Sequence, residues 1–204
     1  MAKITIGIID YGAGNISRLK TLLASLGFKA FISSKVQVLD SADVLLLPGV
    51  GAFPQAMYNL RSSELDSFVI DKARSMTPIL GICLGMQLLC SMSDEIQLTS
   101  GLNLLPANVK LLRSEKSNIG WSKLFSTKAN IYLNDFNGEY FYFNHSYEYI
   151  GPSEYIQAFC LSPCSAHEIA AVIKKDSLVG IQFHPEKSQQ AGLNLLKQTI
   201  HDFF

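Results

Sequence analysis

The order of short apolar segments and helical segments is the feature that most constrains the fold. Residues 3–10 (KITIGIID) are β-branched and almost entirely apolar, which is typical of a strand buried on both faces. A turn follows, and then helical apolar spacing with Asn15 as the capping residue and Gly27 at its end. The alternation continues with expected strands at 28–32, 43–47 and 78–82 and expected helices at 55–76 (in two pieces) and 84–92. Such alternation predicts a parallel sheet with helices on both faces.

After Gly101 the pattern changes to short apolar segments separated by turns. Expected strands lie at 109–112, 121–125, 131–133, 140–144, 155–160, 169–174 and 178–183, and a final helix is expected at 188–204. This spacing favours an antiparallel or mixed sheet edge. No repeat or linker separates the two halves, so we expect a single domain over residues 1–204. The predicted fold is α/β, with a mostly parallel open sheet flanked by helices and an antiparallel or mixed edge in the second half.

The charge balance argues against several classes of partner. The chain has 17 basic and 17 acidic residues, and a protein that binds nucleic acid or a membrane surface needs a basic excess or stripe. The uncharged segment 75–93 is long enough to span a bilayer. Pro78, Gly81 and Gly85 interrupt it, however, and a short strand followed by a short helix explains it better.

The cysteines, at positions 83, 90, 160 and 164, form no C-x-x-C pair, and no secretory signal pattern precedes them. They are typical of thiols in a reducing compartment, and we expect a cytoplasmic protein. Cys160 and Cys164 lack the second pair that a zinc site needs.

Residues 81–85 read Gly-Ile-Cys-Leu-Gly and fit G-x-C-x-G, the cysteine form of the nucleophile elbow. In this motif a strand ends, the chain turns sharply, and the residue at the turn is held in strained backbone geometry at the start of a helix. The glycines leave room where a Cβ would clash, and the helix N-terminus favours a thiolate over a thiol at Cys83. A buried small residue between two packing glycines remains the alternative for this motif alone.

The expected strand 178–183 leads into His184-Pro185-Glu186. Residues two apart in an extended chain project from the same face, so His184 and Glu186 can lie side by side. The carboxylate can then hold one imidazole nitrogen and leave the other to act on Cys83, as in a Cys–His–Glu triad. The alternatives are a surface histidine beside a proline turn and a zinc site of Cys83, His184 and Glu186, which would need a further ligand.

Pro48-Gly49-Val50-Gly51 follows the expected strand 43–47. Glycines on both sides of a residue leave backbone amides exposed and able to reorient, as an oxyanion hole requires. This strand and strand 78–82 can end at the same carboxyl edge of the sheet, where sites in open α/β sheets form. Taken alone, the tetrapeptide is only a turn.

Four motifs together resemble the class I, triad-type glutamine amidotransferases: GICLGMQLL (81–89), PGVGAF (48–53), NHSY (144–147) and QFHPEKS (182–188). Within the class, DYGAGN (10–15), PGVGAF and FHPEKS are most similar to the glutaminase subunits of imidazole glycerol phosphate synthases. The match runs through nearly the whole chain in the family's order. The resemblance implies a flavodoxin-like α/β fold and no metal or cofactor.

The resemblance also implies a role for each matched residue. Cys83 would be the nucleophile, His184 the general base and acid, and Glu186 the orienting carboxylate. Gln87 would hold the amino-acid end of L-glutamine. The other residues implied in oxyanion stabilisation and substrate binding are Gly49, Val50, Gly51, Leu84, His145, Ser146 and Tyr147.

In this family the ammonia passes to a separate (β/α)8-barrel cyclase, which makes imidazole glycerol phosphate and an aminoimidazole ribotide in histidine biosynthesis. The resemblance places Asn15, Trp121, Tyr142 and Lys187 near the face that docks this partner in a heterodimer, although Trp121 would equally suit a core position. The family's usual Pro-His-Met-Gly-Trp-Asn segment is Ser-Asn-Ile-Gly-Trp-Ser here (117–122). We expect this change on the partner side, leaving the glutaminase chemistry intact. The change leaves open the alternative that this chain is a paralogue that supplies ammonia to a nucleotide-sugar amidotransferase.

Two functions of other classes remain as alternatives. Gly12-Ala13-Gly14 opens a helix after the first strand, as in a dinucleotide-binding motif, but Ser17 stands where the third glycine belongs and no acidic residue lies near position 32. A catalytically silent regulatory or binding module on the same fold is the other, and the intact Cys, His and Glu argue against it. His167 and His201 show no companions for chemistry, and we expect them at the surface or an interface.

Overall fold

A computed structural model of the chain describes residues 3–113, 117–127, 132–162 and 167–204. The elements of the first half are β1 (Thr5–Ile9), α1 (Ile16–Ser25), β2 (Lys29–Ser33), α2 (Val36–Leu39), β3 (Val44–Leu47), α3 (Phe53–Ser62), α4 (Leu65–Arg74), β4 (Ile79–Ile82), α5 (Leu84–Leu88), β5 (Cys90–Ser93) and β6 (Thr99–Ser100). The second half contributes β7 (Leu105–Leu111), β8 (Asn118–Ser126), the 3-10 helix η1 (Tyr132–Phe136), β9 (Tyr140–His145), β10 (Tyr147–Ile150), η2 (Ser153–Tyr155), β11 (Ile156–Leu161), β12 (Glu168–Lys175), β13 (Leu178–Ile181), η3 (Pro185–Lys187) and α6 (Gln189–His201).

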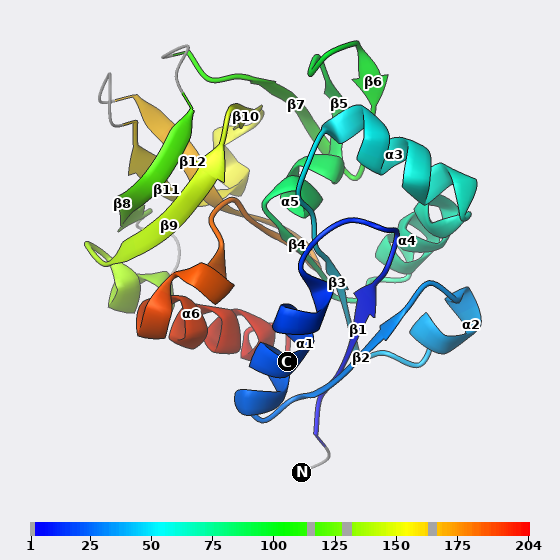
Figure 1. Cartoon of the computed structure of the whole chain (residues 1–204). Coiled ribbons are helices and arrows are strands. Elements are labelled where there is room, and N and C mark those ends of the chain that lie inside the picture. The colour runs from blue at the N-terminus through cyan, green and yellow to red at the C-terminus, as the bar shows by residue number, and fades with distance from the viewer. Residues whose placement is uncertain (1–2, 114–116, 128–131, 163–166) are drawn as a thin grey trace.

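The described residues form a nine-stranded sheet with the strand order β2-β1-β3-β4-β13-β12-β11-β8-β9 (Figure 1). The pairings from β2 to β13 are parallel, and those from β13 to β9 are antiparallel. A smaller sheet has the order β10-β7-β5-β6. The predicted α/β fold with a mostly parallel sheet and an antiparallel or mixed edge in the second half is therefore confirmed.

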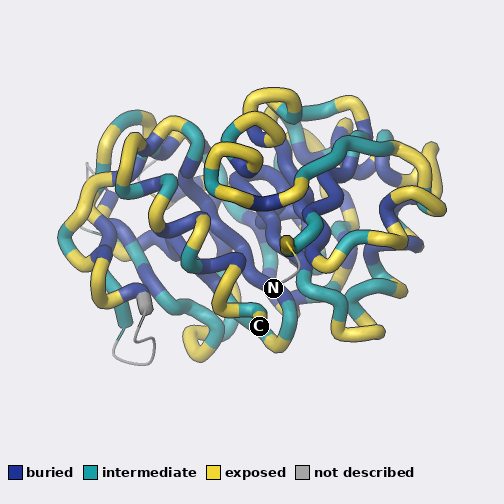
Figure 2. The backbone as a smooth tube through the Cα atoms, turned by 90° about the horizontal axis from the view of Figure 1, so that it is seen from below, coloured by how far each residue is buried: buried dark blue, intermediate teal, exposed yellow. Residues whose placement is uncertain are grey.

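The parallel strands bury apolar side chains on both faces of the large sheet. Ile8 of β1 belongs to the layer that also contains side chains of α1 and α6, whereas the next residue, Ile9, packs with side chains of α3, α4 and the small sheet. Buried segments accordingly run through the centre of the molecule, and exposed ones lie around it (Figure 2). Phe141 and Phe183 of the second half share the first layer with Leu23 of α1, so both halves contribute to one core.

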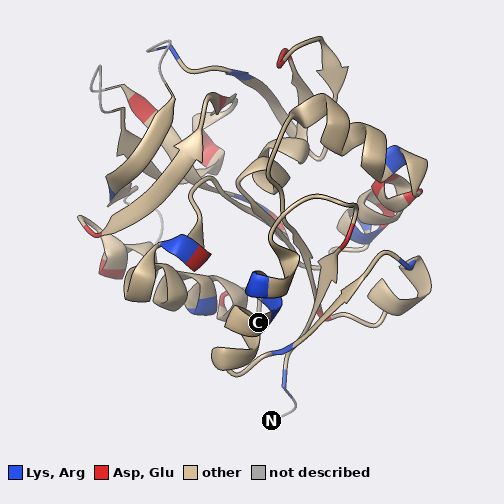
Figure 3. Cartoon of the chain, viewed as in Figure 1, with Lys and Arg blue, Asp and Glu red and all other residues tan. Residues whose placement is uncertain are grey.

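Charged residues of both signs are scattered over the outer elements (Figure 3). No helix in the described part of the chain is long and apolar enough to cross a membrane. The uncharged segment 75–93 instead contains β4, α5 and β5, which explains its apolar character by burial in the core.

Several local predictions are wrong. The helix expected at 84–92 ends at Leu88, because Cys90 and the following residues pair with β7 instead. The prediction of a strand at 131–133 is wrong, because residues 132 and 133 lie in the 3-10 helix η1. Ile131 lies outside the described residues. Asn15 stands at the N-cap of α1, but its side chain makes no capping hydrogen bond.

Candidate active site

Cys83 lies in the sharp turn between β4 and α5. Its backbone has φ 54° and ψ −110°, a strained conformation for a residue with a side chain. A Cβ on Gly85 would lie 1.8 Å from the Leu47 carbonyl oxygen, and a Cβ on Gly81 would lie 2.7 Å from the Gly85 carbonyl oxygen. Only glycines therefore allow α5 to pack this closely on β3 and β4, which is the geometry that the G-x-C-x-G motif predicts.

The sheet brings His184 to this turn. β13 pairs in parallel with β4, and the Cys83 N–H donates to the Ile181 carbonyl (2.7 Å). The chain beyond β13 carries His184 and Glu186 on one side, and His184 Nδ1 lies 2.9 Å from Glu186 Oε1. Both side chains are almost fully buried. The predicted pairing of His184 with Glu186 is present, and the other ring nitrogen is left for Cys83.

The electrostatics of His184 follow from these neighbours. Burial lowers the pKa of His184, but hydrogen bonds with Cys83 and Glu186 and the negative charges of both groups outweigh it and raise the pKa to about 9. Burial raises the pKa of Glu186, and the hydrogen bond and charge of His184 outweigh this effect and lower it. An imidazolium is therefore stable between the sulfur and the carboxylate, as acid–base work at this position requires.

Cys83 and His184 face a small cavity of about 200 Å³. Among the residues predicted to bind substrate, all except Gly49 line it: Val50, Gly51, Leu84, Gln87, His145, Ser146 and Tyr147. The walls therefore come from the ends of β3 and β4, from α5 and from the β9–β10 connection, which are far apart in the sequence.

The Pro48–Gly51 segment follows β3, the neighbour of β4. A Cβ on Gly49 would come within 2.7 Å of Leu84 Cβ and 2.8 Å of the Gly85 nitrogen, so a glycine is required where this segment passes α5. The buried Tyr11 hydroxyl donates to the Pro48 carbonyl (2.6 Å) and anchors the start of the segment. The backbone amides beyond it remain at the rim of the cavity, and we keep the oxyanion role as a proposal.

Sequence reasoning missed two residues of the cavity wall, Glu95 and Asn144. Glu95 lies in the tight turn after β5, and its Oε2 accepts the N–H of Phe53 at the start of α3 (2.8 Å). A carboxylate is the group expected to bind the α-ammonium of an amino acid. No local pattern marks Glu95, because the contact depends on how the small sheet sits against α3.

Gln87 is buried, and its amide donates to the Tyr147 carbonyl (3.1 Å) and to Gln182 Oε1 (3.1 Å). It therefore ties α5 to the β9–β10 connection as well as lining the cavity. Its direct contact with substrate stays a prediction.

Three of the four residues expected at a partner face lie together. The rings of Trp121 and Tyr142 meet edge to face with centroids 5.9 Å apart, and Lys187 Nζ lies 5.5 Å from the Tyr142 ring centroid. Trp121 is 45% exposed and is therefore not a core residue. Asn15 is exposed at the start of α1. The Tyr142 carbonyl also accepts the His184 N–H (2.9 Å), which connects this surface to the triad segment.

The changed segment 117–122 reaches the cavity wall. Asn118 is 1% exposed and its amide lies 3.2 Å from His145 Nε2, while Ser117 Oγ lies 2.7 Å from Ser146 Oγ. The changed residues 117 and 118 therefore also support the cavity wall, and the location of the segment on the partner side stays a prediction. β8 reaches the cavity because Asn118 stands opposite His145 in the ladder of β8 and β9.

His167 has a companion that the sequence did not reveal. Its Nε2 lies 2.8 Å from Oε2 of the buried Glu148. In the described residues no group of three or more His, Cys, Asp and Glu could hold a metal ion, so the alternative zinc site of Cys83, His184 and Glu186 gains no support. Cys164 lies outside the described residues.

Comparisons with known proteins agree with this geometry. The family model "Glutamine amidotransferase class-I" matches residues 7–203. The chain is 41% identical over 194 residues to "Imidazole glycerol phosphate synthase subunit HisH" of Listeria monocytogenes serotype 4a, covering 93% of this chain and 92% of the relative. It is 38% identical over 200 residues to the protein of the same name from Lactococcus lactis, covering 96% and 97%.

Solved structures of more distant proteins share the fold. A chain described as part of a putative GMP synthase from Thermoplasma acidophilum aligns with a TM-score of 0.74 at 21% identity, covering 100% of this chain and 95% of that one. A chain of PurLQS from Thermotoga maritima aligns with a TM-score of 0.73 at 16% identity, covering both chains completely.

Proposed function

This chain belongs to the class-I glutamine amidotransferase family, and from this premise we propose that it is the glutaminase subunit of an imidazole glycerol phosphate synthase in histidine biosynthesis. It hydrolyses L-glutamine to glutamate and ammonia and works with a partner subunit. The observation that carries the proposal is Cys83 in a strained turn beside the His184–Glu186 pair, at a cavity of amino-acid size. The names of both curated relatives favour histidine biosynthesis over the supply of ammonia to a nucleotide sugar.

Substrate binding follows from the charges and amides of the wall. The Glu95 carboxylate binds the α-ammonium of glutamine, and Gln87 and the residues 145–147 hold its amino-acid end. The side-chain carboxamide then points to Cys83. Its carbonyl oxygen then lies near the backbone amides of Val50, Gly51 and Leu84, which line the cavity.

In the first step the Cys83 sulfur attacks the carboxamide carbon, and a C–S bond forms while the carbonyl oxygen becomes negative. The oxyanion is stabilised by backbone N–H groups, and one such donor is typically worth about 3 kcal/mol. His184 then gives a proton to the amide nitrogen, the C–N bond breaks, and ammonia leaves. Glu186 keeps the ring oriented and stabilises its charged form.

In the second step water replaces the departed ammonia. Neutral His184 takes a proton from this water, whose oxygen attacks the γ-glutamyl thioester carbon. The C–S bond breaks, glutamate leaves, and the sulfur recovers its starting state beside His184. Ammonia is the only other product, so the partner subunit must receive it before it escapes to water.

We assign the partner as a separate (β/α)8-barrel cyclase that consumes the ammonia. Trp121, Tyr142 and Lys187 form a half-exposed aromatic and cationic cluster, and such residues are common energetic anchors of interfaces. Because the Tyr142 carbonyl holds the His184 N–H, docking on this cluster acts on the triad segment through one hydrogen bond.

The test is Cys83→Ala in the complex with the cyclase. We expect glutamine hydrolysis to be lost, partner binding to be kept, and the cyclase reaction to be restored by ammonium salt. Cys90→Ala is the matched control and keeps glutamine hydrolysis, because the Cys90 side chain is buried away from the cavity. Hydrolysis by Cys83→Ala, or labelling of a different cysteine by a glutamine analogue with an electrophilic side chain, would refute the proposal.

A further inference from the structure

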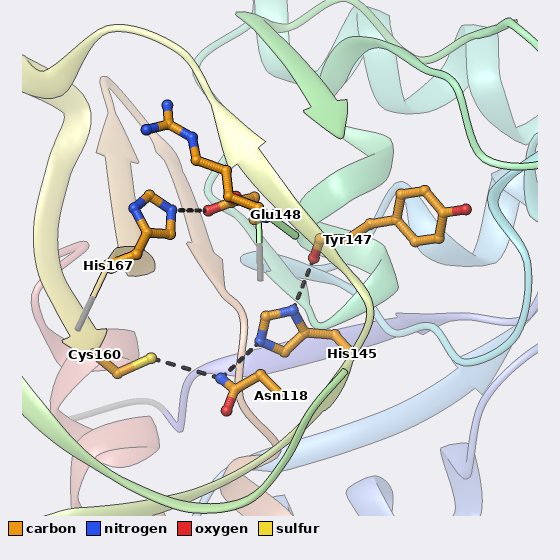
Figure 4. A network of polar contacts seen from close by, with 7 residues as sticks. Asn118, His145, Tyr147, Glu148, Cys160 and His167 are labelled. Carbon is orange, nitrogen blue, oxygen red and sulfur yellow. Dashed lines mark hydrogen bonds and ion pairs between the residues drawn. The ribbon is translucent and has the colours of Figure 1, made fainter. Parts of the chain in front are cut away.

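A chain of polar contacts runs from the cavity wall into the core of the antiparallel edge (Figure 4). His145 Nδ1 lies 2.8 Å from the Tyr147 carbonyl oxygen, and His145 Nε2 lies 3.2 Å from the Asn118 amide nitrogen. The same amide nitrogen donates to Cys160 Sγ (3.7 Å). His145 is 7% exposed and Asn118 is 1% exposed, so water does not replace these partners.

These contacts determine the protonation of the His145 ring. A carbonyl oxygen only accepts hydrogen bonds, so Nδ1 must carry the proton that Tyr147 receives. Nε2 then faces the NH2 group of Asn118 and can only accept from it. The Ser122 hydroxyl donates to the Asn118 carbonyl oxygen (3.5 Å), so the other end of the amide also has a partner when the NH2 group faces the ring.

We propose that Asn118 is a positioning residue of this site, which holds His145 as the neutral Nδ1–H tautomer and so keeps an uncharged imidazole in the cavity wall beside His184. The functional part of this proposal rests on the proposed glutaminase activity. Asn118 touches neither substrate nor nucleophile and acts through His145. The residue stands in the segment 117–122, where this chain differs from the family pattern.

The charges around His145 explain why its neutrality matters. From the cavity side it faces His184, with Cys83 and Glu95 in the same wall, and behind Asn118 lie Cys160 and the carboxylate of Glu148. Burial lowers the pKa of His145; the hydrogen bond to Tyr147 raises it, the charge of His184 lowers it further, and the pKa is about 4. A second imidazolium at His145 would repel the positive charge of protonated His184 and lower the pKa of His184. The mechanism needs His184 to be a strong base.

The decisive variant is Asn118→Asp, studied by NMR titration of the histidine side chains in the full chain without substrate. A carboxylate at 118 accepts rather than donates, so we expect His145 to become doubly protonated near neutral pH. The new positive ring lies nearer to His184 than the carboxylate does, and the pKa of His184 should fall. If His145 stayed neutral, the carboxylate alone would raise the pKa of His184, so an upward shift, or no change at either histidine, overturns the proposal.

Asn194→Asp is the matched control, because it makes the same chemical change on the exposed face of α6. It should leave both histidines unchanged. If Asn118→Asp fails to fold, Asn118→Ala serves instead. Loss of the amide donor should then raise the pKa of His145 above its wild-type value, although burial still lowers it, and an unchanged pKa overturns the proposal.

Kinetics in the complex give a second readout. In Asn118→Ala we expect the KM for glutamine to rise about tenfold, the effect of losing one hydrogen bond in the binding wall, with a smaller change in kcat. A fall in kcat alone would contradict a positioning role. Because the NMR titration needs no glutamine, an inactive wild-type complex would reject the proposed function while the titration still decides whether Asn118 holds the His145 tautomer.

Discussion

Replacing Glu186 by Gln tests how the triad uses its buried carboxylate. Glu186 Oε1 lies 2.9 Å from His184 Nδ1, and in the described part of the structure Oε2 is buried without a hydrogen-bond partner. The side-chain amide of a glutamine at position 186 can face the His184 ring in two orientations. With its oxygen on Nδ1 the ring keeps its tautomer, but the amide NH2 occupies the unpartnered position. With its NH2 on Nδ1 the ring must carry its proton on the other nitrogen and cannot accept one there.

The magnitude follows from both effects. An unpartnered buried NH2 costs about 1–3 kcal/mol, which favours the placement with the wrong tautomer. The pKa of His184, raised to about 9, corresponds to about 3 kcal/mol of preference for the imidazolium. Cys83 is the larger source of this preference and Glu186 the smaller one, so we assign about 1 kcal/mol of it to Glu186. The sum of about 2–4 kcal/mol predicts that kcat/KM for glutamine falls by roughly 30- to 10³-fold.

The assay is glutamate release by the complex with the cyclase, with ammonia-dependent turnover as the internal control for folding and docking. Glu168→Gln, at an exposed position of β12, is the matched variant and should keep full activity. Glu186→Gln with more than a tenth of wild-type kcat/KM would refute the assigned role of the carboxylate.

Two further predictions concern stability. Gly85→Ala should prevent folding or cost more than about 3 kcal/mol, because its Cβ would lie 1.8 Å from the Leu47 carbonyl oxygen; a melting temperature within a few degrees of wild type would contradict the packing described for the elbow. Acid should destabilise the fold through His145: the unfolded chain binds a proton below pH 6.5, whereas folded His145, with a pKa of about 4, does not. Its contribution of about 3 kcal/mol is present above pH 6.5 and is lost as the pH falls toward 4. Denaturant unfolding of wild type and His145→Gln across this range measures it, and equal pH slopes would contradict the burial of a neutral ring.

The residues of the proposed triad were predictable because their signals are local. Gly81, Cys83 and Gly85 lie within five residues, and His184 and Glu186 are two apart on an extended chain. Such spacing is visible in the sequence, and the packing of α5 on β3 and the pairing of β13 with β4 complete the geometry. The alternation of strands and helices likewise predicts the parallel half of the sheet, since each strand there is buried on both faces.

The surroundings of the site were less predictable because they depend on contacts distant in sequence. Residues 90–92 were expected at the end of the helix 84–92, but pairing with β7 makes them part of a strand. Glu95 reaches the cavity only because it accepts the Phe53 N–H, 42 residues earlier in the chain. The contact of Asn118 with His145 was not predictable for the same reason, since the register of β8 against β9 places it behind His145.

The alternation of side chains along β8 constrains how this protein can evolve. Asn118 faces inward to the cavity wall, whereas Trp121, an odd number of residues away, faces outward beside Tyr142. Inserting or deleting one residue between them would reverse the direction of one with respect to the other. The support of the cavity wall by Asn118 and the position of Trp121 at the surface therefore depend on the same strand register. Evolution of β8 between them must proceed by substitution, without insertion or deletion.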